Sequence, residues 1–339
     1  MRILVTGGSG FLGKRLIASL LSQGNDVVNV DIIPSGLAHQ NLHEKLIDIN
    51  NLDTLYNSDI VVHCAALVPS SKRKKAMIYV NRNGTQNLLE LSLKLNVQRF
   101  IHISSSAVYG KPILNPVNSN SPKIPFEIYG KSKLMAEEIC KEYLSQGVPI
   151  SIIRPRTILG YSRSGLFSFI FLLIQRGKKI PVLSNGENKY QFIDVDDFVN
   201  LIHEVIKNED NLEINVGAKE FSTIRSTLEK LIEHAKSESK LVNVPKPLLR
   251  IVTALSKVKL LPFAPYQLHM YGESMWFDIN EIDKSVNWLP QYSSIESIVK
   301  SYDTFIELKK DGEPVDFQRS LHSKPINSVL LRYLIRFLP

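Results

Sequence analysis

The chain begins Met1-Arg-Ile-Leu-Val-Thr-Gly-Gly-Ser-Gly-Phe-Leu-Gly13, and this stretch decides the fold that we expect. Its apolar residues 3–5 are typical of a strand buried on both faces, and glycines follow immediately. Gly8, Gly10 and Gly13 match G-x-G-x-x-G, a pattern whose glycines permit a tight turn, admit a pyrophosphate and let the next helix pack closely. The stretch therefore predicts a dinucleotide site at a helix N-terminus.

The residues that follow favour a nucleotide-binding unit over an isolated glycine-rich turn. Apolar residues recur at helical spacing across 11–21, and a second apolar run, 27–30, ends in Asp31. An acidic side chain about 20 residues beyond the glycines is placed to accept hydrogen bonds from the ribose hydroxyls of NAD. The same carboxylate would repel the 2′-phosphate of NADP, so NAD is the expected cofactor.

Short apolar strands alternate with helical patterns as far as residue 155, which indicates an α/β fold with a doubly wound parallel (Rossmann) sheet. We expect strands at residues 3–5, 27–30, 45–47, 60–62, 99–103 and 150–153, and helices at 11–21, 80–95 and 129–144. The expected domains are an NAD-binding domain, 1–155, a smaller mixed α/β substrate-binding portion interleaved with it, 156–308, and a linker with an amphipathic tail, 309–339.

Composition and charge narrow the class of protein. Cys64 and Cys140 have no metal-ligand spacing and suggest neither a disulfide framework nor a metal site. The first strand leaves no room for a signal peptide and no apolar run has the length of a membrane span, so we expect a cytoplasmic protein. A net charge of +8 suits anionic partners, but the basic run 72–75 lacks interleaved aromatic residues, so we do not expect nucleic-acid binding.

Two groups of residues carry acid–base and hydrogen-bonding chemistry. Tyr129 and Lys133 are four residues apart on an expected helix, where a lysine ammonium beside a phenol lowers the pKa of the phenol. Ser104 to Ser106 follow the strand 99–103, and we favour Ser105 as a donor to a substrate oxygen. Taken alone, the first group is a common surface pair and the second a turn with local hydrogen bonds.

With these residues in view, the chain resembles the extended short-chain dehydrogenase/reductase family, in particular its NAD-dependent sugar epimerase/dehydratase branch, over about residues 1–305. The resemblance rests on Thr6-Gly-Gly-Ser-Gly-Phe-Leu-Gly13, Asp48-Ile49, His63-Cys-Ala-Ala66, Asn81-Arg-Asn-Gly-Thr85, Ser105 before Val108-Tyr-Gly110, Tyr129 with Lys133, Arg154-Pro155 and Trp288-Leu-Pro290. It implies catalysis by Ser105, Tyr129 and Lys133. Together with Asp31, it implies cofactor contacts from Gly7, Gly10, Phe11, Leu12, Gly13, Asp48, Ile49, Cys64, Ala65, Ala66, Asn81, Tyr129, Lys133 and Pro155.

The reaction implied by the resemblance is hydride transfer at a sugar carbon. Tyr129 would act as the base, Lys133 would hold the ribose and lower the tyrosine pKa, and Ser105 would hydrogen-bond the reacting oxygen. In an epimerase, a keto intermediate formed at C4 takes the hydride back on its other face. The implied partners are a nucleotide-diphosphate sugar or similar small molecule and a second copy of the chain in a homodimer.

Several positions depart from the family pattern. Ser106 and Ala107 stand where dehydratases carry an Asp-Glu pair, which argues against dehydration. Thr157, Tyr190 and Asp194 replace the Asn, Arg and His of many UDP-sugar enzymes, which leaves the nucleotide open. The residues expected to contact substrate are Ser106, Arg156, Thr157, Arg163, Lys189 and Tyr190, although the three basic ones among them equally fit solvated surface charges.

Other functions fit parts of the sequence. A sugar ketoreductase or a hydroxysteroid or lipid-alcohol dehydrogenase would keep the fold, and the apolar, basic run 245–270 favours a lipid-like substrate. A non-catalytic dinucleotide sensor is disfavoured by the Tyr129–Lys133 pair. The tail 326–339 has an apolar stripe beside Arg332 and Arg336; we expect it to pack on the protein or a second subunit, and a peripheral contact with the inner membrane face is the alternative.

Overall fold

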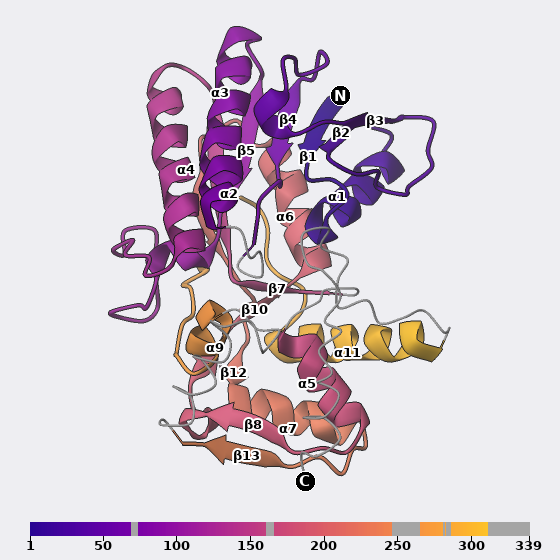
Figure 1. The fold of residues 1–339 in the computed structure, drawn as a ribbon, viewed down its shortest axis with the longest axis vertical. Helices are drawn as coiled ribbons and strands as arrows, with labels where there is room; N and C mark the ends of the chain where they lie inside the picture. The colour runs from indigo at the N-terminus through magenta and orange to yellow at the C-terminus, as the bar shows by residue number, and fades with distance from the viewer. Residues whose placement is uncertain (69–73, 161–165, 246–264, 281, 283–285, 311–339) are drawn as a thin grey trace.

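The computed structural model describes residues 1–68, 74–160, 166–245, 265–280, 282 and 286–310. Figure 1 shows a large sheet with helices on both faces at one end of the molecule and a smaller part of short strands and helices at the other. Residues 72 and 73 of the basic run, Arg163, residues 246–264 of the apolar, basic run and the tail 326–339 lie outside the described residues.

The large sheet has seven strands, all parallel, in the order β11-β6-β5-β4-β1-β2-β3. The strands are β1 (Arg2–Thr6), β2 (Asp26–Asp31), β3 (Leu42–Leu46), β4 (Ile60–His63), β5 (Arg99–Ile103), β6 (Ile150–Pro155) and β11 (Glu213–Val216). Every residue of β4, β5 and β6 is buried, as expected for strands covered on both faces. The predicted doubly wound Rossmann sheet is confirmed.

Two details of the sheet differ from the prediction. The strand expected at 45–47 lies at Leu42–Leu46, because this edge strand has three consecutive polar residues at its centre, is at most partly buried and gives a weak apolar signal. The sequence predicts six strands, whereas the sheet has a seventh, β11, which arrives 57 residues after the end of β6 and pairs with it. The sheet therefore includes a segment that lies within 156–308.

Helices cover both faces of the sheet, each over its own apolar core. On one face lie α1 (Phe11–Ser22) and α6 (Val195–Lys207), and on the other lie α2 (Lys74–Ile78), the π-helical turn η2 (Tyr79–Asn83), α3 (Gly84–Lys94) and α4 (Ile128–Ser145). The first core contains Ile3, Ile17 and Ile202, and the second contains Leu4, Leu88 and Ile139. The helix predicted at 80–95 thus begins earlier, at Lys74, and is interrupted by a π turn.

The smaller part is built from three two-stranded sheets and four helices in the described residues. Its pairs are β7 (Thr157–Leu159) with β10 (Phe192–Asp194), β9 (Lys189–Tyr190) with β12 (Ser222–Thr223), and β8 (Ile180–Leu183) with β13 (Leu241–Val244). The helices are α5 (Leu166–Gln175), α7 (Ile224–His234), α9 (Pro265–Tyr271) and α11 (Ser294–Lys310). One-turn helices lie at η1 (Ile49–Asn51), η3 (Ser106–Tyr109) and η4 (Ser184–Gly186). A third core, which includes Phe171, Leu228 and Tyr302, holds this part together.

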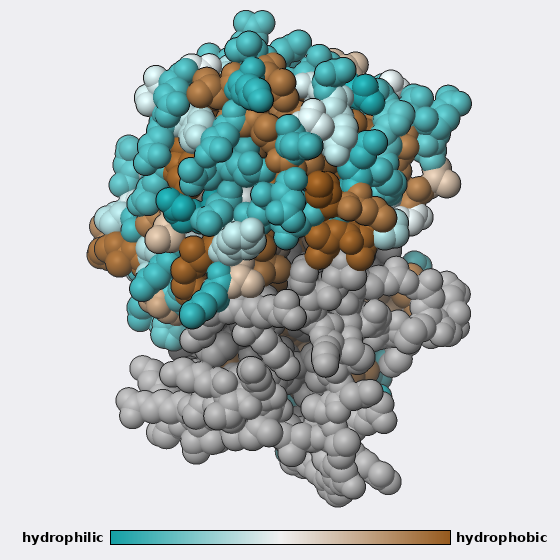
Figure 2. All heavy atoms as spheres, turned by 45° about the horizontal axis from the view of Figure 1, so that its top comes forward, coloured by the Kyte–Doolittle hydropathy of each residue, from teal (hydrophilic) through white to brown (hydrophobic). Residues whose placement is uncertain are grey.

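The surface of the large sheet part is mainly polar. In Figure 2 hydrophilic side chains dominate this face, and hydrophobic ones gather in small groups. The most exposed large apolar residues, Ile113 and Leu114, lie between η3 and α4. Within the described ranges, no helix combines the length and the apolarity needed to cross a membrane.

Candidate active site

The glycine loop joins β1 to α1 through backbone contacts that a side chain would block. A Cβ on Gly13 would lie 2.2 Å from the oxygen of Gly7, and a Cβ on Gly7 would lie 2.6 Å from the backbone of Ala65. A Cβ on Gly10, by contrast, would meet only the oxygen of Gly7 at 3.2 Å among the described atoms. Gly10 is the N-cap of α1, so exposed backbone stands at a helix N-terminus, where an anion is stabilised.

Asp31 lies beside this loop at the end of β2. Its carboxylate accepts hydrogen bonds from the backbone N–H of Ser9 (3.0 Å) and of Ile32 (2.7 Å). The side chain is only partly buried. The position at the carboxyl end of the second strand, next to the anion site, fits a ribose-binding carboxylate.

Asp48-Ile49 and the segment that begins at Asn81 are far apart in the sequence but meet in the fold. Asp48 caps η1 by accepting from the N–H of Asn50 at 2.9 Å. Ile49 fills the space over Gly84, where a Cβ would lie 2.3 Å from the Cδ1 of Ile49. Glycine at position 84 therefore lets α3 pack against η1.

A row of buried hydrogen bonds connects β1, β4 and α3. The Oγ1 of Thr6 lies 2.7 Å from Nδ1 of His63, and Nε2 of His63 lies 2.9 Å from Oγ1 of Thr85. Burial, aided by the charge of Lys133, holds the pKa of His63 well below its usual value, so the ring is neutral. These hydrogen bonds hold the carboxyl end of β4, which Cys64, Ala65 and Ala66 follow. Burial raises the pKa of Cys64 to about 12, which keeps it an unreactive thiol.

Asn81 connects the loop after β4 to α4. Its side chain accepts from the N–H of Leu67 (2.7 Å) and donates to the oxygen of Leu67 (3.0 Å) and to Oγ of Ser132 (2.9 Å). Ser132 in turn donates to the backbone oxygen of Tyr129 at 2.8 Å. The π turn η2 contains Asn81, so it delivers the amide that joins the cofactor loop to the helix carrying Tyr129 and Lys133.

The start of α4 lies against η3 because residue 130 is glycine. The carboxylate of Glu127 caps the helix by accepting from the N–H groups of Tyr129 (2.7 Å) and Gly130 (2.5 Å). A Cβ on Gly130 would lie 2.4 Å from the oxygen of Ala107. This close approach brings Tyr129 to the turn that Ser105 initiates as its N-cap.

Lys133 completes this arrangement from one helical turn further on. Its Nζ donates to the backbone oxygen of Ile103 at 2.6 Å, and its side chain is buried. Burial lowers the pKa of Lys133 to about 8, although the thiols of Cys64 and Cys140 and the carboxylate of Glu137 favour its charged form. Ile103 ends β5 two residues before Ser105, so the structure brings the three predicted catalytic residues to one strand end.

A buried ion-pair network behind Lys133 escapes the sequence analysis. Arg154 donates from Nε and Nη2 to the two carboxylate oxygens of Glu137, both at 2.8 Å, and from Nη2 to Glu213 at 2.5 Å. Ser104 donates to the same Glu137. Burial alone would lower the pKa of Arg154, but Glu137 raises it, so the guanidinium stays charged. Glu137 lies one turn after Lys133, and that four-residue spacing is the signal that could have identified it.

Four of the residues expected to contact substrate come together beside Ser105. Arg156 donates to Oγ of Ser106 at 3.1 Å and lies over the ring of Tyr190, whose hydroxyl is 2.9 Å from Oγ1 of Thr157. Lys189 is not part of this group: it is exposed, and its Nζ lies 5.1 Å from the ring centroid of Trp276. Adjacent residues of a strand face opposite sides, which separates Lys189 from Tyr190.

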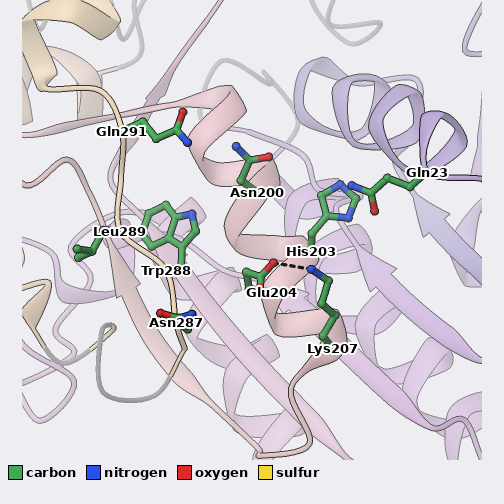
Figure 3. A pocket seen from close by; sticks show the side chains of 9 residues that line it. All are labelled: Gln23, Asn200, His203, Glu204, Lys207, Asn287, Trp288, Leu289 and Gln291. Atoms are coloured by element: carbon green, nitrogen blue, oxygen red, sulfur yellow. Dashed lines mark hydrogen bonds and ion pairs between the residues drawn. The ribbon is translucent and has the colours of Figure 1, made fainter.

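A surface hollow of about 320 Å³ lies away from these residues. Figure 3 shows it beside α6, with His203 and Lys207 on one wall and Trp288 on the other. None of its lining residues belongs to the predicted catalytic or cofactor set. The hollow therefore adds nothing to the candidate active site.

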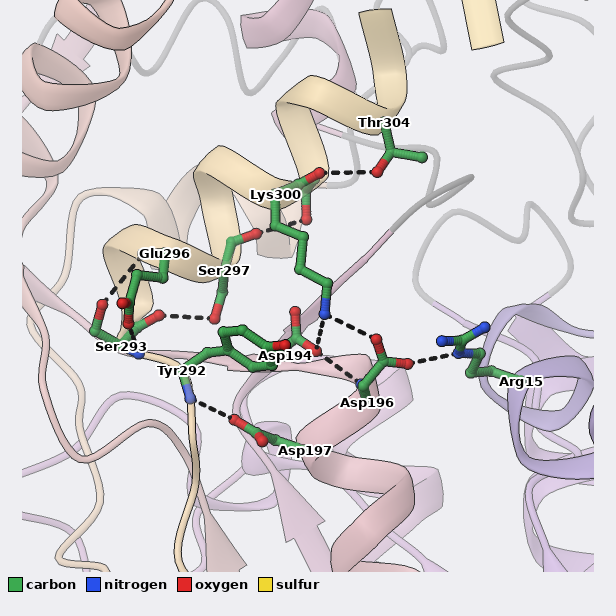
Figure 4. Close-up of polar contacts among 11 residues, drawn as sticks. Arg15, Asp194, Asp196, Asp197, Tyr292, Ser293, Glu296, Ser297, Lys300 and Thr304 are labelled. Atoms are coloured by element: carbon green, nitrogen blue, oxygen red, sulfur yellow. Dashed lines mark hydrogen bonds and ion pairs between the residues drawn. The ribbon is translucent and has the colours of Figure 1, made fainter. Parts of the chain in front are cut away.

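A polar junction connects the two parts of the molecule (Figure 4). Lys300 of α11 donates to Asp194 at 3.0 Å and to Asp196 at 2.8 Å, and Asp196 also pairs with Arg15 of α1 at 2.5 Å. Burial would raise the pKa of Asp196, but the hydrogen bonds from Arg15 and Lys300 lower it. Asp194, which stands in place of a family histidine, thus helps to anchor α11.

Comparison with known proteins identifies the family of this chain. The model of the NAD dependent epimerase/dehydratase family matches residues 3–217. A protein of Sinorhizobium fredii (strain NBRC 101917 / NGR234) named "Uncharacterized protein y4nG" is 36% identical, over 99% of this chain and 87% of that protein. UDP-N-acetyl-alpha-D-glucosaminuronate decarboxylase of Bacillus cytotoxicus is 29% identical, over 72% of this chain and 83% of its own length. A crystal structure of UDP-glucuronic acid 4-epimerase from Bacillus cereus with UDP-glucuronic acid and NAD is 25% identical, with a TM-score of 0.76 over 91% of this chain and 100% of that one.

Proposed function

The chain belongs to the NAD-dependent epimerase/dehydratase family, and on that premise we propose that it is a nucleotide-sugar epimerase acting at C4, with Ser105, Tyr129 and Lys133 as catalytic residues. It is an NAD-dependent enzyme of the extended short-chain dehydrogenase/reductase type that modifies sugar nucleotides. The observation that carries the proposal is the bond from Lys133 Nζ to the oxygen of Ile103, which holds the Tyr129 helix against the strand end that leads to Ser105.

The residues divide the acid–base work among them. Tyr129 takes the proton of the sugar hydroxyl, and Ser105 donates a hydrogen bond to the same oxygen. With a pKa of about 8, Lys133 is mainly protonated at neutral pH, and its charge favours the phenolate form of Tyr129. Bound NAD would supply the acceptor for the hydride of the sugar carbon and the donor for its return. Tyr129 then gives the proton back to the oxygen of the inverted carbon.

The backbone of the glycine loop supports NAD as the bound form. The backbone at Gly10, the N-cap of α1, would bind the pyrophosphate, and Asp31 would hold the adenosine ribose. The remaining contacts expected from the resemblance lie along the same edge, on Asp48, Ala65 and Pro155. The carboxylate of Asp31 disfavours the additional phosphate of NADP.

Epimerisation is favoured over dehydration by the two residues after Ser105. Elimination of water needs an acid and a base next to the sugar, and positions 106 and 107 are Ser and Ala. The hydroxyl of Ser106 accepts from Arg156, and a serine hydroxyl is a far weaker acid than a carboxyl group. The proposed substrate is therefore a nucleotide-diphosphate sugar that loses no group during turnover.

A homodimer and the expected domain division remain proposals. Exposed apolar residues of α3 and α4, among them Leu93, Met135 and Leu144, offer a face for a second copy. Light scattering of the purified protein would test this assembly, because a monomer at all concentrations would contradict it. The contact of the tail 326–339 with a membrane stays a prediction of the sequence.

Product analysis tests the proposed reaction. Purified protein with NAD is incubated with UDP-glucose and with UDP-glucuronate, and the sugars are followed by proton NMR while NADH is followed at 340 nm. An epimerase forms the C4 epimer with no net NADH. Stoichiometric NADH would instead identify a ketoreductase or dehydrogenase, and the absence of any conversion or hydride exchange would identify a sensor.

A further inference from the structure

Arg156 is a buried guanidinium enclosed by aromatic and thioether groups. Its side chain leaves the end of β6 and is only 3% exposed. The guanidinium carbon lies 5.0 Å from the ring centroid of Tyr190 and 6.0 Å from that of Phe277. Nη1 donates to Oγ of Ser106 at 3.1 Å and to Sδ of Met275 at 3.3 Å. All four surrounding groups are neutral.

The other two nitrogens of Arg156 are unsatisfied. Nε and Nη2 are buried and have no hydrogen-bond partner among the described residues. A guanidinium does not lose its proton in a protein, and aromatic faces offset only part of the cost of burying its charge. Among the residues that the structure describes, no anion pairs with Arg156.

Arg154 shows which anion fits. It lies two residues earlier on β6 and uses the same edge of its guanidinium, Nε and Nη2, to hold both oxygens of the Glu137 carboxylate at 2.8 Å. The edge left open on Arg156 has the same pair of donors, whose planar fork matches a carboxylate. Of these two buried arginines, Arg154 on β6 has a carboxylate partner, and Arg156, directly after β6, has none among the described residues.

The place of Arg156 identifies the part of the substrate that it meets. Its Nη1 is bonded to Ser106, the residue next to Ser105, which touches the reacting sugar oxygen if the proposed function holds. We propose that Arg156 binds a carboxylate carried by the hexose itself, so that the substrates are nucleotide-activated uronic acids. Arg156 then sets substrate specificity.

Binding to the NAD-loaded protein tests this proposal with three ligands: UDP-glucuronate, UDP-glucose and UDP. The wild type should bind UDP-glucuronate more tightly than UDP-glucose. Arg156→Met should weaken the binding of UDP-glucuronate by about 10²-fold, as expected for loss of one partner of a buried ion pair. The same variant should change the affinity for UDP much less. Arg156→Lys keeps the charge but loses the planar fork, so its affinity for UDP-glucuronate should lie between those of the wild type and Arg156→Met.

The ligand-free proteins supply a second readout that does not depend on activity. Removal of an unpaired buried charge leaves a protein equally or more stable, so Arg156→Met should melt at or above the wild-type temperature. Arg154→Met, the matched control, should melt at a lower temperature because Glu137 loses its partner. If Arg156→Met melts as low as Arg154→Met, Arg156 is structural and the proposal is wrong.

The remaining outcomes of the binding experiment also decide whether the proposal for Arg156 holds. Equal losses for UDP and UDP-glucuronate in Arg156→Met would assign Arg156 to the diphosphate and overturn the proposal. Tight binding and conversion of UDP-glucose with no preference for UDP-glucuronate would overturn it and leave the proposed epimerase function intact. If no nucleotide sugar, charged or neutral, binds or is converted, the proposed function fails as well.

Discussion

The cofactor region and the substrate region of this molecule are built in different ways. Around the glycine loop and α4, function depends on backbone contacts between elements of the parallel sheet, such as the one between Gly13 and Gly7. The wall around Arg156 is made of side chains from η3, β9 and residues 275–277, which are far apart in the sequence. Short motifs therefore specify the first region, whereas the second depends on long-range packing.

The largest effect is expected at the phenol of the cofactor region. Tyr129→Phe should lower kcat by about 10²–10⁴-fold, because it removes the group that transfers the proton. NAD should still bind, since the glycine loop and Asp31 are unchanged. Tyr143→Phe on the same helix is the matched control and should stay near wild-type turnover. Near-normal activity of the Tyr129 variant would remove Tyr129 from the mechanism.

The second largest effect is expected on the stability of the protein when Arg154 of β6 is replaced. Arg154→Met should destabilise the protein by about 3–5 kcal/mol in chemical denaturation, because Glu137 is left buried without its ion pair. A cost below about 1 kcal/mol, comparable to that of an exposed ion pair, would show that the network contributes little.

The pH dependence of stability tests the burial of Lys133. Its pKa is about 8 in the folded protein against an ordinary value of 10.5, so between these pH values the unfolded chain binds more protons than the native one. The contribution of Lys133 to the free energy of unfolding of the NAD-free protein should therefore rise with pH across this window, by about 3 kcal/mol at most, whereas the raised pKa of Cys64 acts in the opposite direction. The difference in free energy of unfolding between the wild type and Lys133→Met isolates this contribution and should change with pH across the window, whereas the difference between the wild type and Lys131→Met, an exposed control on the same helix, should stay constant. An unchanged slope in Lys133→Met would contradict the assignment.

Two glycines of the loop should separate folding from binding. Gly13→Ala places a Cβ against the oxygen of Gly7 and should cost about 1–3 kcal/mol of stability. Gly10→Ala brings its Cβ to 3.2 Å from the oxygen of Gly7, a milder contact than the one at Gly13, so its melting temperature without ligand should fall less than that of Gly13→Ala while NAD affinity falls. If both variants lose only stability, the loop has no special role in binding.

The smallest effect is the choice of cofactor. Asp31→Ala removes a negative charge near the ribose and should raise the affinity ratio of NADP to NAD by about tenfold. The melting temperature with each nucleotide measures the ratio, since ligands stabilise by mass action. A ratio equal to that of the parent would show that Asp31 does not contact the ribose.

The contrast between the two regions explains what the sequence could predict. The glycine loop, Asp31 and the Tyr129–Lys133 pair follow from local spacing, and the structure gathers them at one edge of the sheet. The strand β11 and the partners of Arg156 could not be predicted, because nothing local marks Met275 or Phe277 as neighbours of β6. Glu137 could have been predicted, because it is the next residue on the face of α4 that carries Lys133.

The most direct test of the proposed epimerase activity follows the hydrogen at C4 of the sugar. A nucleotide sugar with deuterium at C4 is incubated with the NAD-loaded protein, and the product is analysed by NMR and mass spectrometry. Removal and return of one hydride predicts an inverted sugar that retains deuterium at C4, with no free NADH and no exchange with solvent. Loss of the deuterium to solvent, or its accumulation in released NADH, would contradict the proposal.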